Sequence, residues 1–178
     1  MEDDIRAAAD CGADGVVIGA LLPDGLIDVV TMTRLLKIAP SLCYTFHRAV
    51  DMSQDPVQAA SVIAELGFHR ILSSGGSASA LEGVETLRGM VEATKSSRVV
   101  VVAGGGIDET NAATLLQATG VRMLHASLRA PKDGPMEFRK QGVWMGGEKS
   151  NDTQTEFMRK VADAERIASL LAEVDSIE

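Results

Sequence analysis

The stretch VVVVAGGGIDETN, residues 99–111, decides the fold class of this chain. Its four consecutive valines, Val99–Val102, are apolar on both faces of a strand, which is typical of a parallel sheet covered by helices. The three glycines at 104–106 then remove side chains at the point where the chain turns. Asp108 or Thr110 is expected to cap the helix that follows. The stretch therefore predicts the strand, turn and helix of an α/β fold.

The same order of strand, turn and helix repeats along the chain. Strand-like runs, roughly 24 to 28 residues apart, begin near Val16, Cys43, Ile71, Val99 and Met123. Helical patterns lie between them, at residues 27–39, 57–66, 81–93 and 110–119. Successive βα units predict a parallel sheet with right-handed crossovers.

Two architectures share this pattern, an open doubly wound sheet and a TIM (β/α)8 barrel. A barrel needs eight βα units and about 250 residues. This sequence carries five units, and a helical stretch at residues 3–11 comes before the first of them. We predict an incomplete TIM barrel of about five C-terminal βα units. The first and last strands would then be exposed edges, so we expect apolar surface at residues 16–18 to cause self-association.

Residues 130–178 are predicted to extend the single domain, 1–178, as a loop followed by a helix. The first part of this extension is rich in glycine and proline, and residues 156–161 alternate as in a strand. Asp163 is expected to cap the final helix. The apolar residues expected on the buried side of that helix are Ile167, Leu170, Leu171 and Val174.

Composition narrows the classes of partner. With 178 residues and 46% hydrophobic content, the chain is long enough for one core. A formal charge of −8 and only 3% aromatic residues argue against a nucleic acid or an anionic membrane as the main partner. Two cysteines and no apolar leader predict a cytoplasmic protein, with the nucleus left open.

Polar, small and ionisable residues concentrate at the carboxyl ends of the expected strands. In both candidate architectures these ends carry the functional site. The residues expected to bind a ligand there are His47, Arg48, Asp51, Ser73, Ser74, Gly75, Gly104, Gly105, Gly106, His125 and Ser127. Their convergence predicts a pocket for a small ligand, whereas no catalytic residue and no metal ligand can be assigned.

The expected role of each of these residues has a structural alternative. A bare glycine turn before a helix suits an anion, but it equally suits a tight βα turn. His47 and His125 can act as acid, base or ligand, although for either histidine alone a core position bonded to a backbone carbonyl is the more common case. Alternation along residues 43–47 places Thr45 and His47 toward the barrel axis. Arg48 can hold a phosphate or carboxylate, or pair with Asp51.

Seven stretches resemble the CutC copper-homeostasis family and cover essentially the whole chain. They are GADGVVIGAL (12–21), YTFHRAVD (44–51), LGFHRILSSGG (66–76), SALEG (79–83), VVVVAGGGI (99–107), HASLR (125–129) and VWMGG (143–147). The resemblance implies a TIM barrel, a cytoplasmic location and a role in copper tolerance or Cu(I) binding. It also implies three further N-terminal strands, which hold the cysteines proposed as copper ligands in animal members.

Two hypotheses of function follow. The resemblance implies a copper-homeostasis protein without an assigned reaction, with copper as its ligand. The polar strand ends and the glycine turn favour an enzyme or binder of a small phosphorylated or anionic metabolite. Cys43 and His47 do not form a copper site, because four residues of a strand separate them by roughly 13 Å.

Overall fold

A computed structural model describes residues 1–140, 143 and 157–177. Five parallel strands form one sheet in the order β1-β2-β3-β4-β5, so strands that follow one another in sequence are neighbours. They are β1 (Gly15–Ile18), β2 (Cys43–Phe46), β3 (Arg70–Ser73), β4 (Val100–Gly104) and β5 (Met123–His125). All five lie where the sequence predicts them. The sequential order is that of a barrel and excludes a doubly wound sheet.

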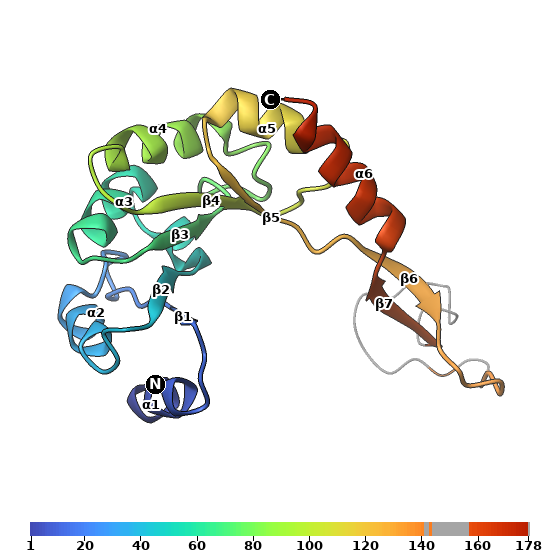
Figure 1. Cartoon of the computed structure of the whole chain (residues 1–178), viewed down its shortest axis with the longest axis horizontal. Coiled ribbons are helices and arrows are strands. Elements are labelled where there is room, and N and C mark those ends of the chain that lie inside the picture. The colour runs from blue at the N-terminus through green and yellow to red at the C-terminus, as the bar shows by residue number, and fades with distance from the viewer. Residues whose placement is uncertain (141–142, 144–156, 178) are drawn as a thin grey trace.

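Helices separate the strands and cover one face of the sheet. They are α2 (Val29–Leu36), α3 (Pro56–Glu65), α4 (Val84–Thr94) and α5 (Ala112–Thr119), with α1 (Glu2–Asp10) before the first strand and the 3-10 helix η1 (Arg48–Met52) after β2. Figure 1 shows α2 to α5 on the convex side of a curved sheet. The sheet does not close, and β1 and β5 are its edges.

The core lies between the sheet and these helices. Tyr44 and Phe46, which the alternation of β2 predicts to face the helices, are 1% and 0% exposed. Both rings meet Phe68 edge to face, with centroids 6.3 and 5.4 Å apart. On the other face, Val17 is 60% exposed. Ile18 is buried, so the apolar surface expected at residues 16–18 reduces mainly to Val17.

The predicted cap of α5 is wrong. Neither Asp108 nor Thr110 caps the helix, which begins after Asn111. Asp108 Oδ1 instead accepts the N–H of Thr110 at 2.9 Å, and the N–H of Asp108 donates to Asn111 Oδ1 at 3.1 Å. The short polar side chains therefore close a turn immediately before the helix rather than capping it.

The C-terminal extension contains more structure than the sequence predicts. Residues 129–133 form strand β6 (Arg129–Asp133), which pairs antiparallel with β7 (Met158–Ala162). The loop expected from residue 130 is therefore wrong for residues 130–133, whereas the extended segment near residue 160 is confirmed. Residues 141–142 and 144–156, which include VWMGG apart from Val143, lie outside the described residues.

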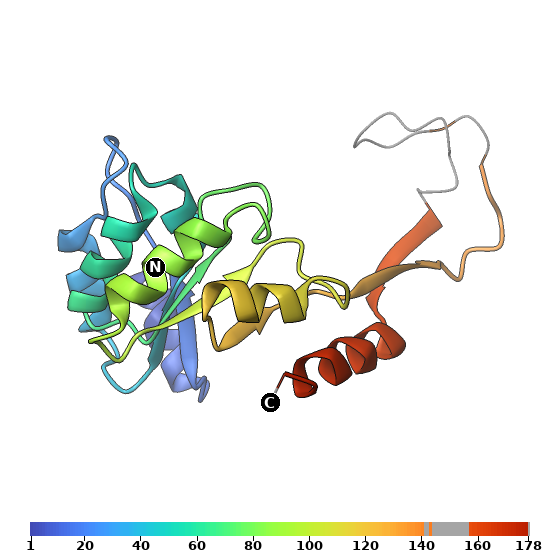
Figure 2. The same ribbon diagram turned by 90° about the horizontal axis from the view of Figure 1, so that it is seen from above.

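The final helix, α6 (Ala164–Asp175), has its predicted cap, because Asp163 Oδ1 accepts the N–H groups of Glu165 and Arg166. Its predicted buried face is only half right. Leu170 and Val174 pack against the core, but Ile167 and Leu171 are 38% and 54% exposed. Only a narrow stripe of α6 is covered, because the helix lies against the outer helix α5 (Figure 2).

Candidate functional site

The carboxylate of Asp51 is the centre of a hydrogen-bonded cluster at the carboxyl ends of β2 and β3. Its side chain is 7% exposed and comes from η1, directly after β2. Ser73 Oγ donates to Asp51 Oδ1 at 2.5 Å, and the backbone N–H groups of Ser74 and Gly76 donate to the carboxylate at 3.0–3.1 Å. Asp51 thus fixes the loop that follows β3.

These contacts set the charge of Asp51. Burial raises the pKa of its carboxyl group, but hydrogen bonds from Ser73 and Arg48 and from the backbone of Ser74 and Gly76 outweigh burial. The pKa therefore lies below its ordinary value of 3.8. The group is ionised at neutral pH.

Arg48 forms the pair with Asp51 that its spacing allows, and it also reaches further. Its Nε donates to Asp51 Oδ2 at 2.7 Å and its Nη2 donates to Ser74 Oγ at 2.6 Å. The third nitrogen, Nη1, has no acceptor among residues 1–140, 143 and 157–177. It lies 3.4 Å from the point that a Cβ of Gly105 would occupy, so the guanidinium adjoins the glycine turn.

The glycine turn presents bare backbone to this guanidinium. Gly105 has a φ of +118°, and a Cβ there would lie 3.1 Å from Ser74 Cβ. The carbonyl of Gly105 accepts the N–H of Ala80, which ties the turn to the loop after β3. Within the described part of the chain, the N–H groups of Gly105 and Gly106 have no acceptor. Two amides and one guanidinium nitrogen are thus available to an anion.

Gly104 has a different role. It belongs to β4, and a Cβ at this position would lie 2.7 Å from Leu72 Cδ1 on the neighbouring strand. A side chain at this position would therefore require the Leu72 side chain to shift.

The remaining predicted residues lie away from the cluster. His47 Nδ1 accepts the N–H of Ala49 at 3.1 Å, and its ring lies against Gly19 on the β1 side. His125 and Ser127 are exposed at and beyond the end of the edge strand β5. The structure therefore unites Arg48, Asp51, Ser73, Ser74, Gly75, Gly105 and Gly106.

Sequence reasoning missed three residues of the cluster. Gly76 donates to Asp51, Ser77 supplies a carbonyl 2.7 Å from Ser74 Oγ, and Ser79 lies 3.4 Å from a Cβ position on Gly106. The run SSGGSAS at residues 73–79 is the signal that was available, because such short polar residues favour tight, hydrogen-bonded loops.

The described residues do not form a copper site. No group of three or more His, Cys, Asp or Glu side chains suited to a metal ion occurs in the part of the chain that the structure describes. Cys43 Sγ accepts an N–H from Arg70 Nη1 at 2.9 Å, which places a positive charge against the thiol. Cys11 is exposed at the end of α1. This donor set does not fit Cu(I), which prefers clustered thiolates.

The sequence model of the CutC family matches residues 1–130. The chain belongs to the CutC family. It is 41% identical to the human copper homeostasis protein cutC homolog over 97% of its length, and spans 62% of that relative. It is 38% identical to a CutC family protein from Bacteroides thetaiotaomicron over 99% of its length, spanning 69% of that protein.

Solved structures agree with the fold of this CutC chain. A CutC structure from Streptococcus agalactiae superposes with a TM-score of 0.65 at 30% identity, covering 70% of this chain and 60% of the other. Thiamine phosphate pyrophosphorylase from Pyrococcus furiosus superposes with a TM-score of 0.57 at 21% identity, covering 97% of this chain and 65% of the other. The second likeness shows the fold alone. Among the described helices, none is long and apolar enough to cross a membrane.

Proposed function

We propose that this CutC-family chain binds a small anionic metabolite, carrying a phosphate or carboxylate group, beside Arg48 and the glycine turn. One observation carries the proposal: Arg48 Nη1 adjoins the turn whose Gly105 and Gly106 amides have no acceptor in the described residues. Many TIM barrels bind phosphate at the carboxyl ends of their last strands, which supports the proposal by analogy of fold.

The affinity expected for phosphate depends on the charges of Arg48 and Asp51. Asp51 already neutralises much of the positive charge of Arg48, so inorganic phosphate alone should bind weakly, with a Kd of about 1 mM. A metabolite would gain affinity from contacts made by the rest of its structure. Binding should weaken as salt is added, because Arg48 is 45% exposed.

Phosphate titration followed by NMR tests the proposal. Phosphate should shift the amide signals of Gly105 and Gly106, and Arg48→Gln should weaken binding about tenfold, because it removes a charged donor. Arg88→Gln is the matched control, since Arg88 is an exposed arginine on α4 that also pairs with a carboxylate. Equal phosphate affinity in wild type and Arg48→Gln would refute the proposal.

The family name favours a second role, the handling of a copper ion. The low cysteine content favours the cytoplasm as the location of the protein. Because the donor set around Cys43 does not suit Cu(I), we expect no tight binding in an anaerobic Cu(I) titration of this chain. Tight Cu(I) binding that Cys43→Ser abolishes would favour copper handling over anion binding as the function.

A further inference from the structure

A basic arm projects from the C-terminal part of the molecule. The arm consists of β6, β7 and the described residues 134–140, and it extends away from the sheet and its helices (Figures 1 and 2). A two-stranded hairpin is marginally stable in water on its own. The arm also exposes two large apolar side chains, since Met136 is 54% and Phe138 66% exposed. An exposed aromatic on a projection is typical of a site that docks on another surface.

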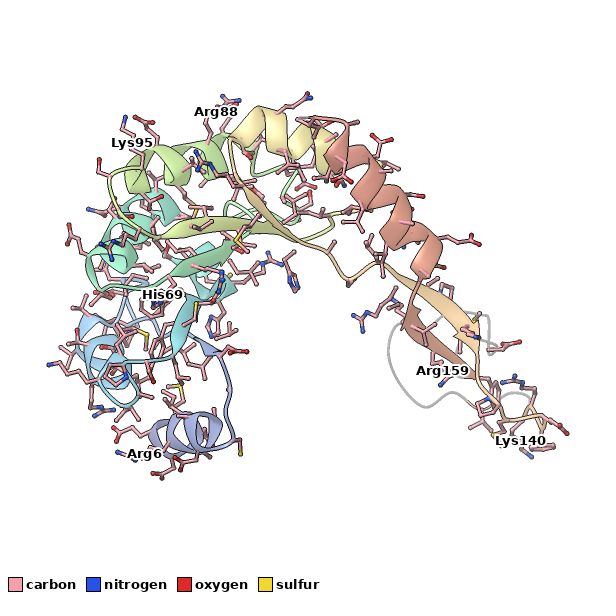
Figure 3. The ribbon with its side chains drawn as sticks, viewed as in Figure 1. Arg6, His69, Arg88, Lys95, Lys140 and Arg159 are labelled. Carbon is pink, nitrogen blue, oxygen red and sulfur yellow. The ribbon has the colours of Figure 1, made fainter. Side chains whose placement is uncertain are left out.

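The described residues of the arm carry a positive net charge in a chain whose net charge is −8. Its basic residues outnumber its acidic residues, with Arg129, Lys132, Arg139, Lys140, Arg159 and Lys160 against Asp133 and Glu137. Lys140 and Arg159 lie toward its far end (Figure 3). The arm thus offers an apolar anchor among cations.

A surface of opposite character lies beside the first turns of α2 and α3. We call it the acidic hollow. It has a volume of about 300 Å³, and its lining includes Leu26, Ile27, Val29, Ala59 and Val62. Two apolar side chains of the lining are well exposed, since Leu26 is 46% and Val29 44% exposed.

The charge of this surface is negative. Asp24, Asp28 and Asp55 lie along the two segments that form the hollow, and none of the described residues that line it is a lysine or arginine. Arg34, further along α2, forms an ion pair with Glu2 of α1 at 3.0 Å. The hydrogen bond from Thr31 lowers the pKa of Asp28 and keeps it ionised. The hollow therefore matches the arm in both apolar character and opposite charge.

We propose that the arm of one copy docks in the acidic hollow of a second copy, with the Phe138 ring in the hollow. The arm cannot reach the hollow of its own chain, because α2 and α3 lie at the opposite end of the molecule (Figure 1). When two copies exchange arms, both hollows are filled and a closed two-fold dimer results. This contact is independent of the anion site, since Arg48 and the glycine turn take no part in it.

Sedimentation equilibrium of the purified chain tests the contact. Wild type should reach twice the chain mass of 18.8 kDa, and Phe138→Ser should weaken dimerisation about tenfold or more. Leu81→Ser is the matched control, because Leu81 is 47% exposed outside both surfaces and its loss should leave the dimer intact. A monomeric wild type, or a Phe138→Ser variant that dimerises as tightly as wild type, would overturn the proposal.

A charge exchange tests the pairing of the two surfaces. Lys140→Glu and Asp24→Lys should each weaken the dimer, whereas the double variant should recover much of the lost affinity. Such recovery requires that the two charges face each other across copies. A double variant weaker than either single variant would place the arm on another surface and contradict the proposal.

Discussion

At the scale of single residues, Asp51 organises the candidate site. It accepts hydrogen bonds from the buried Ser73, from Ser74 and from Gly76. Asp51→Asn should lower the free energy of unfolding by about 2–4 kcal/mol at neutral pH, because buried donors lose a charged acceptor. Urea titration measures the change. Asp133→Asn, at an exposed carboxylate, is the control and should change stability little.

The stabilisation by Asp51 should decrease as the pH falls. The pKa of Asp51 is lower in the folded chain than the ordinary 3.8, so its stabilisation is fully present above about pH 5 and is lost as pH falls through the lowered pKa. The difference in unfolding free energy between wild type and Asp51→Asn should therefore be constant near neutrality and shrink below about pH 4. A difference that grows on acidification would contradict this account of Asp51.

Local spacing predicts some contacts of the site but not others. The pairing of Arg48 with Asp51 follows from three residues of separation, and the polar run after β3 indicates a tight, hydrogen-bonded loop. Alternation along β2 predicts which face of the sheet His47 lies on, but not which residue its ring contacts. Its ring lies against Gly19, a residue of another βα unit, and that packing depends on the register between β1 and β2.

At the scale of elements, one ion pair attaches the last helix. Arg166 of α6 donates to both oxygens of Glu109, at 2.8 and 3.0 Å, in the segment after the glycine turn. Arg166→Ala should increase hydrogen exchange of the α6 amides severalfold while β2–β4 amides stay protected. Lys95→Ala, at the residue that follows α4, removes another ion pair and should leave α6 unchanged. Unchanged exchange in Arg166→Ala would show that packing on α5 alone holds α6.

Elements were predictable where periodicity is strong. The five strands and the helices between them follow from apolar runs and amphipathic repeats in the sequence. The apolar residues of these runs and repeats form most of the buried core. The start of α5 and the strand β6 were not predictable. Asp108 is used in a preceding turn, and β6 contains a proline and pairs with a strand about thirty residues later in sequence.

At the scale of the whole molecule, an open sheet leaves apolar side chains on its uncovered face. Val17 on the edge strand is 60% exposed and Met123 on the opposite edge strand is 38% exposed. Val17→Thr should reduce association beyond the dimer, seen as lower light scattering at high concentration, because it removes apolar surface from an unpaired edge. Leu171→Ser on α6 should have no such effect. Wild-type scattering that shows no species larger than the dimer at any concentration would contradict association through the sheet edge.

The central claim is that Arg48 and the glycine turn bind an anion, and a crystal structure of the chain in phosphate tests it most directly. Phosphate should lie within hydrogen-bonding distance of Arg48 Nη1 and of the Gly105 or Gly106 N–H, with the pair between Arg48 and Asp51 retained. Gly105 and Gly106 amides that donate to protein carbonyls, with no phosphate beside Arg48, would contradict the claim.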